Sequence, residues 1–239
     1  MYRLLILVGF VATSCAPAYI SNSRNVPMFA EGGEFAGSVA LSSGIDVQTA
    51  YSVTDHVAVM ANANAVVKKL TPEGKPSFNK DHFFGEAGLG YFTRTKGARF
   101  ELFGGYGAGS GNSYESYFFF GKNELVAKGS YNRIFIQPSI GTNKRKFNIM
   151  FTTRLSMVKF EKFTTTDPAA VTTSYKPTTS YAFIEPALTA RVHLAGNLRG
   201  FVQLGVNSPV NNDVIFGFVR VQGAIGIQIH TGQLRTRVY

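Results

Sequence analysis

The stretch that decides the fold is Phe147-Asn148-Ile149-Met150-Phe151-Thr152-Thr153-Arg154-Leu155-Ser156-Met157. Its apolar and polar residues alternate, which is the period-2 pattern of a β-strand with one apolar face. The alternation recurs on both sides of this stretch, over residues 34–41, 45–53, 57–68, 83–93, 98–106, 133–140, 184–194, 198–207 and 214–229. No helical period separates these segments, so the sequence predicts an all-β domain of about ten strands, with eight or twelve as alternatives.

The connections between the predicted strands differ regularly in length. Short turns are expected near 54–55, 96–97, 143–145 and 196–197, and they alternate with longer loops near 70–81, 110–129 and 163–179. If all tight turns lie at one end, both chain ends lie there too, as in an up-and-down antiparallel transmembrane barrel with an even number of strands. The sequence therefore predicts a barrel over residues 34–231, followed by a C-terminal tail over 232–239.

The only cysteine of the 239 residues, Cys15, ends the run Val11-Ala12-Thr13-Ser14-Cys15 behind a short apolar stretch. Small residues before a cysteine are typical of a bacterial lipoprotein processing site, and the apolar stretch is too short to span a bilayer. We expect residues 1–14 to be a signal peptide that is removed, and Cys15 to carry a diacylglycerol and an acyl chain such as palmitate. The alternative is an ordinary signal peptide cleaved near Ala16 or Ala18. No other cofactor and no metal are expected.

Residues 15–33 contain Pro17, Pro27 and several Ser and Asn residues without a usable period. They predict a flexible, lipidated tether between the membrane and the barrel. The formal net charge of +10 is spread over the chain without a basic stripe, so we expect lipid as a partner and no nucleic acid. Envelope protein and polysaccharide are further candidate partners.

Composition indicates which face of the predicted strands points inward. Most lysines fall in turns and loops, while the polar strand positions carry Gly, Ser, Asn and Gln with scattered Arg and Glu. Such residues suit a confined interior, whereas a water-exposed face is expected to carry more Lys and Glu. This favours a transmembrane barrel over a periplasmic lipocalin-like carrier with its apolar face inside, and leaves a small pore as a third possibility. The four histidines have no evident serine and acid at matching height, so we expect no enzyme.

Two groups of residues are candidate sites. A hairpin centred near Val171 brings Arg154 and Glu185 to the same height, where we expect an ion pair. We expect this pair to belong to an interior polar network that also contains Glu86, Glu101, Arg133, Arg191, Arg199 and Arg220. In the loop 110–129, exposed aromatic residues can form a docking surface for sugar or protein, or can extend the adjoining strand. These are Tyr114, Tyr117, Phe118, Phe119 and Phe120.

Several segments resemble those of a group of Bacteroidota-type outer-membrane β-barrel lipoproteins of unassigned role. The segments are residues 15–20, 25–29, 31–34, 50–56, 131–141 and 185–188. The resemblance implies location and shape, and it implies no activity. No acidic run of the kind that marks surface-exported lipoproteins follows Cys15, so we expect the lipid in the periplasmic leaflet. The sequence predicts a lipid-anchored outer-membrane barrel with a structural, adhesive or partner-binding role.

Overall fold

The computed structural model describes residues 18–66, 78–116, 124–144, 146–166, 179–210, 214 and 216–232. Its regular elements are the strands β1 (Phe35–Leu41), β2 (Ile45–Ser52), β3 (Val57–Val66), β4 (Phe78–Arg94), β5 (Ala98–Ser116), β6 (Glu124–Thr142), β7 (Phe147–Thr165), β8 (Ser180–Ala195), β9 (Leu198–Val206), β10 (Ser208–Pro209) and β11 (Val221–Thr231). Within these ranges, no helix has the length and apolar character needed to cross a membrane.

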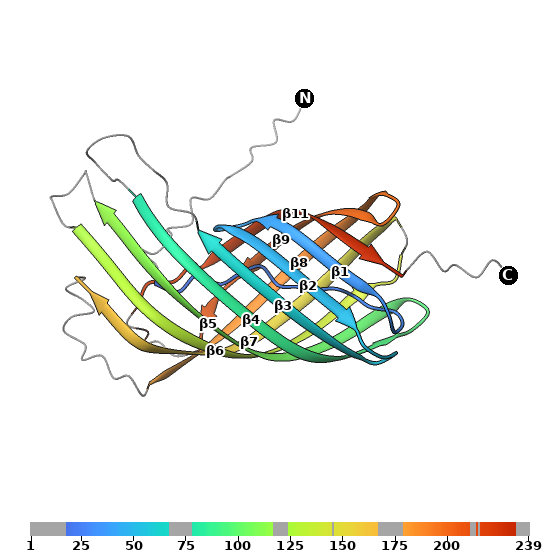
Figure 1. The fold of residues 1–239 in the computed structure, drawn as a ribbon, viewed down its shortest axis with the longest axis horizontal. Helices are drawn as coiled ribbons and strands as arrows, with labels where there is room; N and C mark the ends of the chain where they lie inside the picture. The colour runs from blue at the N-terminus through green and yellow to red at the C-terminus, as the bar shows by residue number, and fades with distance from the viewer. Residues whose placement is uncertain are drawn as a thin grey trace, which may run out of the picture.

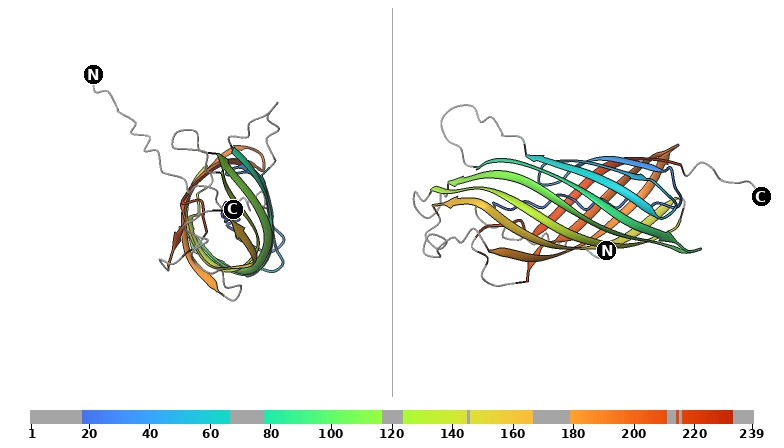
Figure 2. Two further views of the ribbon diagram at one scale, coloured as in Figure 1. Left: turned by 90° about the vertical axis from the view of Figure 1, so that its left-hand side faces the viewer. Right: turned by 60° about the horizontal axis from the view of Figure 1, so that its bottom comes forward.

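The strands form one closed antiparallel barrel (Figure 1). Neighbours along the chain pair from β1 to β9, β11 pairs with both β9 and β1, and the ring is closed. The two-residue strand β10 pairs with β8 beyond the end of β9 and is not one of the ten strands of the ring. Figure 2, in its left view, shows the ring end on. The prediction of an all-β barrel of ten strands is therefore confirmed.

The two ends of the barrel differ, and we name them by their connections. At the turn end lie the tight connections 53–56, 95–97, 143–146 and 196–197, together with the start of β1 and the end of β11. At the loop end lie the ends of β1, β3, β5, β7 and β9 and the starts of β2, β4, β6, β8 and β11, which are separated in sequence by mostly longer segments. The predicted placement of both barrel termini at the turn end is confirmed (Figure 1).

Strands β4 to β7 extend further toward the loop end than the sequence indicated. The predicted loop 110–129 is largely strand, because β5 and β6 stay paired as far as Ser116 and Glu124. The repeated glycine and serine residues in this region read as loop, but the ladder of main-chain hydrogen bonds does not need apolar side chains. The expected loop was therefore too long, and what remains of it, residues 117–123, lies outside the described part of the chain.

The last strand also begins later than predicted, at Val221 instead of near residue 214. Phe216 and Phe218 turn into the barrel and are buried, and Phe218 forms a parallel bridge with Tyr19. Inside the barrel, Phe216 packs against Phe160 and Tyr181, and Phe218 against Phe183, so regular pairing starts only after these residues.

Glycines of β5 make room inside the barrel for large side chains from its neighbours. A Cβ added at Gly107 would lie 2.4 Å from the Phe84 ring and 2.8 Å from the Glu86 Cβ. By contrast, Gly85 on the adjacent strand faces outward, and a Cβ added there meets nothing within 4 Å. The interior around Gly107 is thus packed to contact.

We expect Gly107→Ala to lower the free energy of unfolding by about 1–3 kcal/mol, because the buried neighbours must shift to admit a methyl group. Urea titration of the purified protein in detergent micelles measures this loss. Gly85→Ala is the matched control and should leave the midpoint unchanged or slightly raised. Equal midpoints for both variants would contradict the packing described.

Candidate functional site

The two faces of the barrel wall have opposite polarity. Outward side chains are apolar and exposed, among them Leu41, Ile134 and Leu204 with exposed fractions of 63%, 62% and 63%. Inward side chains are polar or charged and buried, and Arg133 and Arg154 are 0% exposed. A soluble protein buries its apolar side chains and exposes its charged ones to water, so this wall has the reverse arrangement.

Residues 18–30, which we call the inner segment, run through the lumen of the barrel (Figures 1 and 2). Residues 18–29 are all buried, although they contain no regular strand or helix. Ala18 donates its N–H to the Gly217 carbonyl at the loop end, and Phe29 donates its N–H to Glu101 near the turn end. The prediction of a flexible tether is therefore wrong for these residues, because polar groups of the wall bind them at almost every position.

At the turn end the chain leaves the lumen and reverses direction to enter β1. Gly33 has a φ of 82°, in the left-handed region that glycine adopts without strain. Its N–H donates to the Ser52 carbonyl, while the Ser52 hydroxyl donates to the Glu31 carbonyl at 2.8 Å. Inner segment and first strand are thus joined by a tight, hydrogen-bonded reversal.

Four inward glutamines bind the main chain of the inner segment. Gln203 accepts from the Arg24 N–H at 2.8 Å and donates to the Arg24 carbonyl at 3.0 Å. The other three each donate to a carbonyl at 2.7 Å: Gln48 to Ser23, Gln137 to Asn25 and Gln222 to Ser21. Because an extended segment makes no internal hydrogen bonds, these side chains satisfy main-chain groups that burial would otherwise leave unpaired.

Charged side chains gather at mid-lumen in a group that we call the central ion cluster, formed by Arg24, Glu86, Arg133, Arg154 and Glu185. Glu86 pairs with Arg133 and, at 3.4 Å, with Arg154, while Arg24 lies 3.7 Å from Glu185. All five are buried. Three positive and two negative charges therefore share the centre of the barrel, and desolvation makes each partner costly to lose.

Side chains of the inner segment complete the central ion cluster. Asn22 donates to Glu86 at 2.8 Å and accepts from Arg133 at 2.6 Å, so one amide bridges both charges. The Tyr19 hydroxyl donates to Glu185 at 2.7 Å and accepts from Arg133 at 2.9 Å. The cluster thus belongs to wall and inner segment together, which the sequence did not indicate.

Arg154 and Glu185, predicted to pair in the interior, lie there with different partners. Arg154 and Glu185 are direct neighbours on β7 and β8, as expected, but Arg154 pairs with Glu86 instead of Glu185. Arg24, which lies in the predicted tether, is the residue near Glu185 in its place.

Further toward the turn end, Glu101, Arg191 and Arg199 are buried as predicted. Glu101 and Arg191 bind main-chain groups of Phe29 and Val26. Arg220 was wrongly assigned to the interior: it is exposed, with its guanidinium 5.7 Å from the Phe218 ring. It precedes β11, so the alternation of that strand does not determine its direction.

Aromatic side chains close the lumen at both ends, beyond the polar contacts of the inner segment. At the loop end, Tyr19 packs against Tyr131 and Phe183, with ring centroids 5.4 and 5.1 Å apart. At the turn end, Phe29 packs against Phe92 at 5.6 Å. Both ends of the inner segment are therefore held by apolar contacts, and its middle by hydrogen bonds.

The other predicted site residues give less information. Tyr114 lies on β5, and Tyr117 and Phe118–Phe120 lie outside the described residues, as does Cys15. Two of the histidines have side-chain partners inside the barrel: His82 bonds Asn64 and Tyr131, and His230 lies 3.4 Å from Glu34. In the described part of the chain, no group of three or more His, Cys, Asp or Glu residues lies close enough to hold a metal ion.

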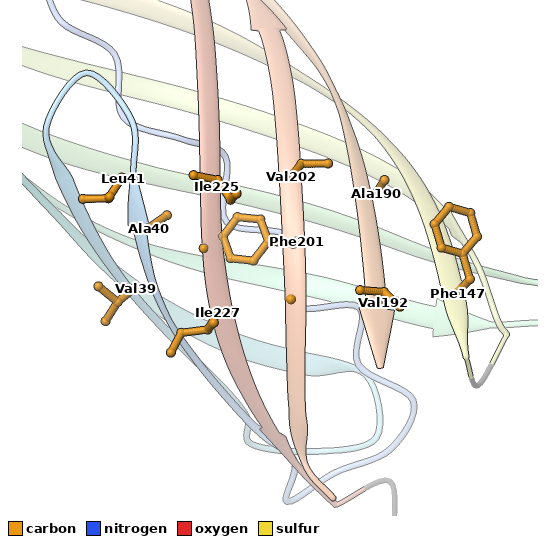
Figure 3. Close-up of a pocket in the computed structure, with 12 residues that line it drawn as sticks. Val39, Ala40, Leu41, Phe147, Ala190, Val192, Phe201, Val202, Ile225 and Ile227 are labelled. Atoms are coloured by element: carbon orange, nitrogen blue, oxygen red, sulfur yellow. The ribbon is translucent and has the colours of Figure 1, made fainter. Parts of the chain in front are cut away.

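An apolar groove of about 650 Å³ crosses the outer surface over β1, β11, β9 and β8 and reaches Phe147 at the start of β7 (Figure 3). Its lining residues are all apolar or glycine. Gly200 deepens it, because the space of its missing side chain is bordered by Leu194 and Val192 at 3.5–3.7 Å. The groove fits hydrocarbon and offers no polar group for orienting a polar ligand.

Comparison with models of protein families finds no match, and comparison with curated proteins finds none.

We expect Glu86→Gln to lower the free energy of unfolding by about 3–5 kcal/mol, because it leaves Arg133 and Arg154 buried without their shared counter-charge. Chemical unfolding in micelles or vesicles, followed by circular dichroism, measures this loss. Glu161→Gln is the control, because Glu161 is exposed and bonds only Asn132 among the contacts described; it should change stability by less than about 0.5 kcal/mol. A loss at Glu86 no larger than at Glu161 would refute the role of the cluster.

Proposed function

We propose that this protein is an outer-membrane β-barrel, anchored in addition by lipid at Cys15, whose lumen is closed by its own inner segment. Its role is structural, adhesive or partner-binding, and not catalytic. The observation that carries the proposal is the reversed polarity of the wall, apolar outside and charged inside. A closed barrel with this polarity satisfies all main-chain groups within the sheet and presents only hydrocarbon to lipid.

The outer surface supports a position within a bilayer. On β5 the outward positions from Phe100 to Ala108 are aromatic, aliphatic or glycine, and they are followed by Ser110 and Asn112. This apolar stretch has about the height of a hydrocarbon core when the strand is tilted. Tyr51, Tyr91 and Phe147 are exposed near the turn end, where amphipathic and aromatic side chains favour the lipid–water interface.

The interior supports a closed barrel over a pore or a carrier. A lipocalin-like carrier needs an apolar cavity, whereas the inward positions here hold the glutamines and the central ion cluster. An open pore needs a water-filled lumen, whereas residues 18–29 fill this one. A ring of ten strands is wider than one whose own side chains fill it, and the extra width accommodates one extended chain.

We expect Leu188→Arg to lower the free energy of unfolding in lipid vesicles by about 2–4 kcal/mol, because it places a guanidinium near the middle of the apolar wall. Leu188 is 53% exposed, so the substitution breaks no interior contact. Asn112→Arg, in the polar part of the same surface, is the control and should cost about 0–1 kcal/mol. A wall that faces water would tolerate both, and equal stability of the two variants would overturn the proposal.

We expect the intact protein to give no ion conductance in planar bilayers, because the inner segment fills the lumen. A protease site inserted between Gly32 and Gly33 allows the reversal to be cut after folding, so that folding and opening are tested separately. Cut protein washed with urea below the unfolding midpoint should lose the inner segment and show conductance steps. Uncut protein washed in the same way is the control. Steps in untreated protein would show that the lumen is open and would contradict this account.

A further inference from the structure

The direction in which the inner segment passes through the barrel determines the side on which the mature N-terminus leaves it. Ala18 lies at the loop end: its N–H bonds Gly217, and Gly111 lies against its carbonyl, so that an added Cβ would be 3.4 Å from this oxygen. Met28 and Phe29 lie at the turn end, bound by Arg99 and Glu101 near the start of β5. The chain therefore enters at the loop end, crosses the lumen and then begins β1 at the turn end.

The height of Ala18 relative to a bilayer follows from the outer surface beside it. Gly111 precedes Asn112, which faces outward and pairs with Asp81 and Lys128 on the neighbouring strands. All three side chains are exposed, in contrast to the apolar positions nearer the turn end. A row of charged and amide groups marks the level at which the wall leaves the hydrocarbon and reaches headgroups and water. Ala18 lies at this level, inside the barrel mouth.

We propose that the lipidated N-terminus is anchored in the leaflet that borders the loop end, so that anchor and long loops share one side of the membrane. The proposal rests on the proposed function for the lipid and the membrane, and adds the side. Cys15 is three residues from Ala18, so chain geometry limits it to about 10 Å from the barrel mouth. The opposite interface lies beyond an apolar band of about 25 Å, and the lumen, which is the direct path to it, is occupied by the inner segment itself.

This side is opposite to the one expected from sequence. The absence of an acidic run after Cys15 favoured the periplasmic leaflet. In barrels of this kind the tight turns usually face the periplasm and the loops face the outside. With that orientation, a chain that enters the lumen at the loop end has its lipid in the outer leaflet. The barrel itself then provides the passage by which the N-terminal chain reaches the surface, because its polar lumen satisfies an extended main chain that hydrocarbon cannot.

The test compares accessibility of one protease site at three positions in intact cells of a diderm host. The site is inserted between Ala16 and Pro17, within residues 117–123 at the loop end, and between Lys96 and Gly97 at the turn end. Added protease should cut the N-terminal and loop-end sites and should spare the turn-end site until the cells are opened. Metabolic labelling with an alkyne fatty acid reports the lipid, since cutting the N-terminal site should remove the label from the barrel band.

Each outcome decides between alternatives. The proposal is overturned if the N-terminal site has the same accessibility as the turn-end site and differs in accessibility from the loop-end site. This holds whichever way the barrel faces. Absence of fatty-acid label from an N-terminally intact protein refutes lipid anchoring, while co-cutting of the N-terminal and loop-end sites would still support the direction of threading. Heat-modifiable gel migration confirms folding of each insertion variant, and a Cys15→Ala variant gives the unlabelled reference.

Discussion

Burial of polar groups in a closed lumen is the constraint on which the whole structure depends. Once ten strands close into a ring with their apolar side chains outward, their polar faces have no bulk water to bind. Each charge and each amide must then find a partner within the barrel, or its desolvation is uncompensated. The inner segment supplies these partners: its main chain pairs with the four glutamines, Tyr19 and Asn22 bind the central ion cluster, and Arg24 is itself a member of the cluster.

The position of the inner segment also constrains the order of assembly. Closure pairs β1 with β11, the first and last strands of the ring, and β1 follows the inner segment directly through Gly33. A chain that passes through a closed ring either lies inside before the ring closes or is threaded afterwards. Because Tyr19 and Phe29 pack against aromatic groups at opposite ends, later threading requires bulky side chains to pass the occupied centre. Closure around an inner segment already in place avoids this.

The sequence predicted what has a local period and missed what lacks one. Alternation along β7 gave the strand, its two faces and the inward direction of Arg154 and Glu185, because neighbouring side chains of a strand point to opposite faces. The inner segment has no such period, since wall side chains bind its main chain, and Pro17, Pro27 and its small polar residues read as a tether. One signal was present: glutamine, whose amide both donates and accepts, recurs at inward positions 48, 137, 203 and 222.

The choice of glutamine explains how the lumen holds an extended chain by its main chain. A carboxamide both donates and accepts, so Gln203 can bind the N–H and the carbonyl of one residue, which neither an ammonium nor a carboxylate can do. It also adds no charge to a centre that already contains five. Main-chain groups are the same for every residue, so the lumen constrains sequence where side chains are used. Tyr19, Asn22 and Arg24 are used at the central ion cluster, and Ser21, Ser23 and Asn25 bond the side chains of Gln222, Gln48 and Asn62. Because Ser21, Ser23 and Asn25 are small, polar and uncharged, they fit the lumen and bond the wall without adding charge, which accounts for a composition that resembles an unstructured linker.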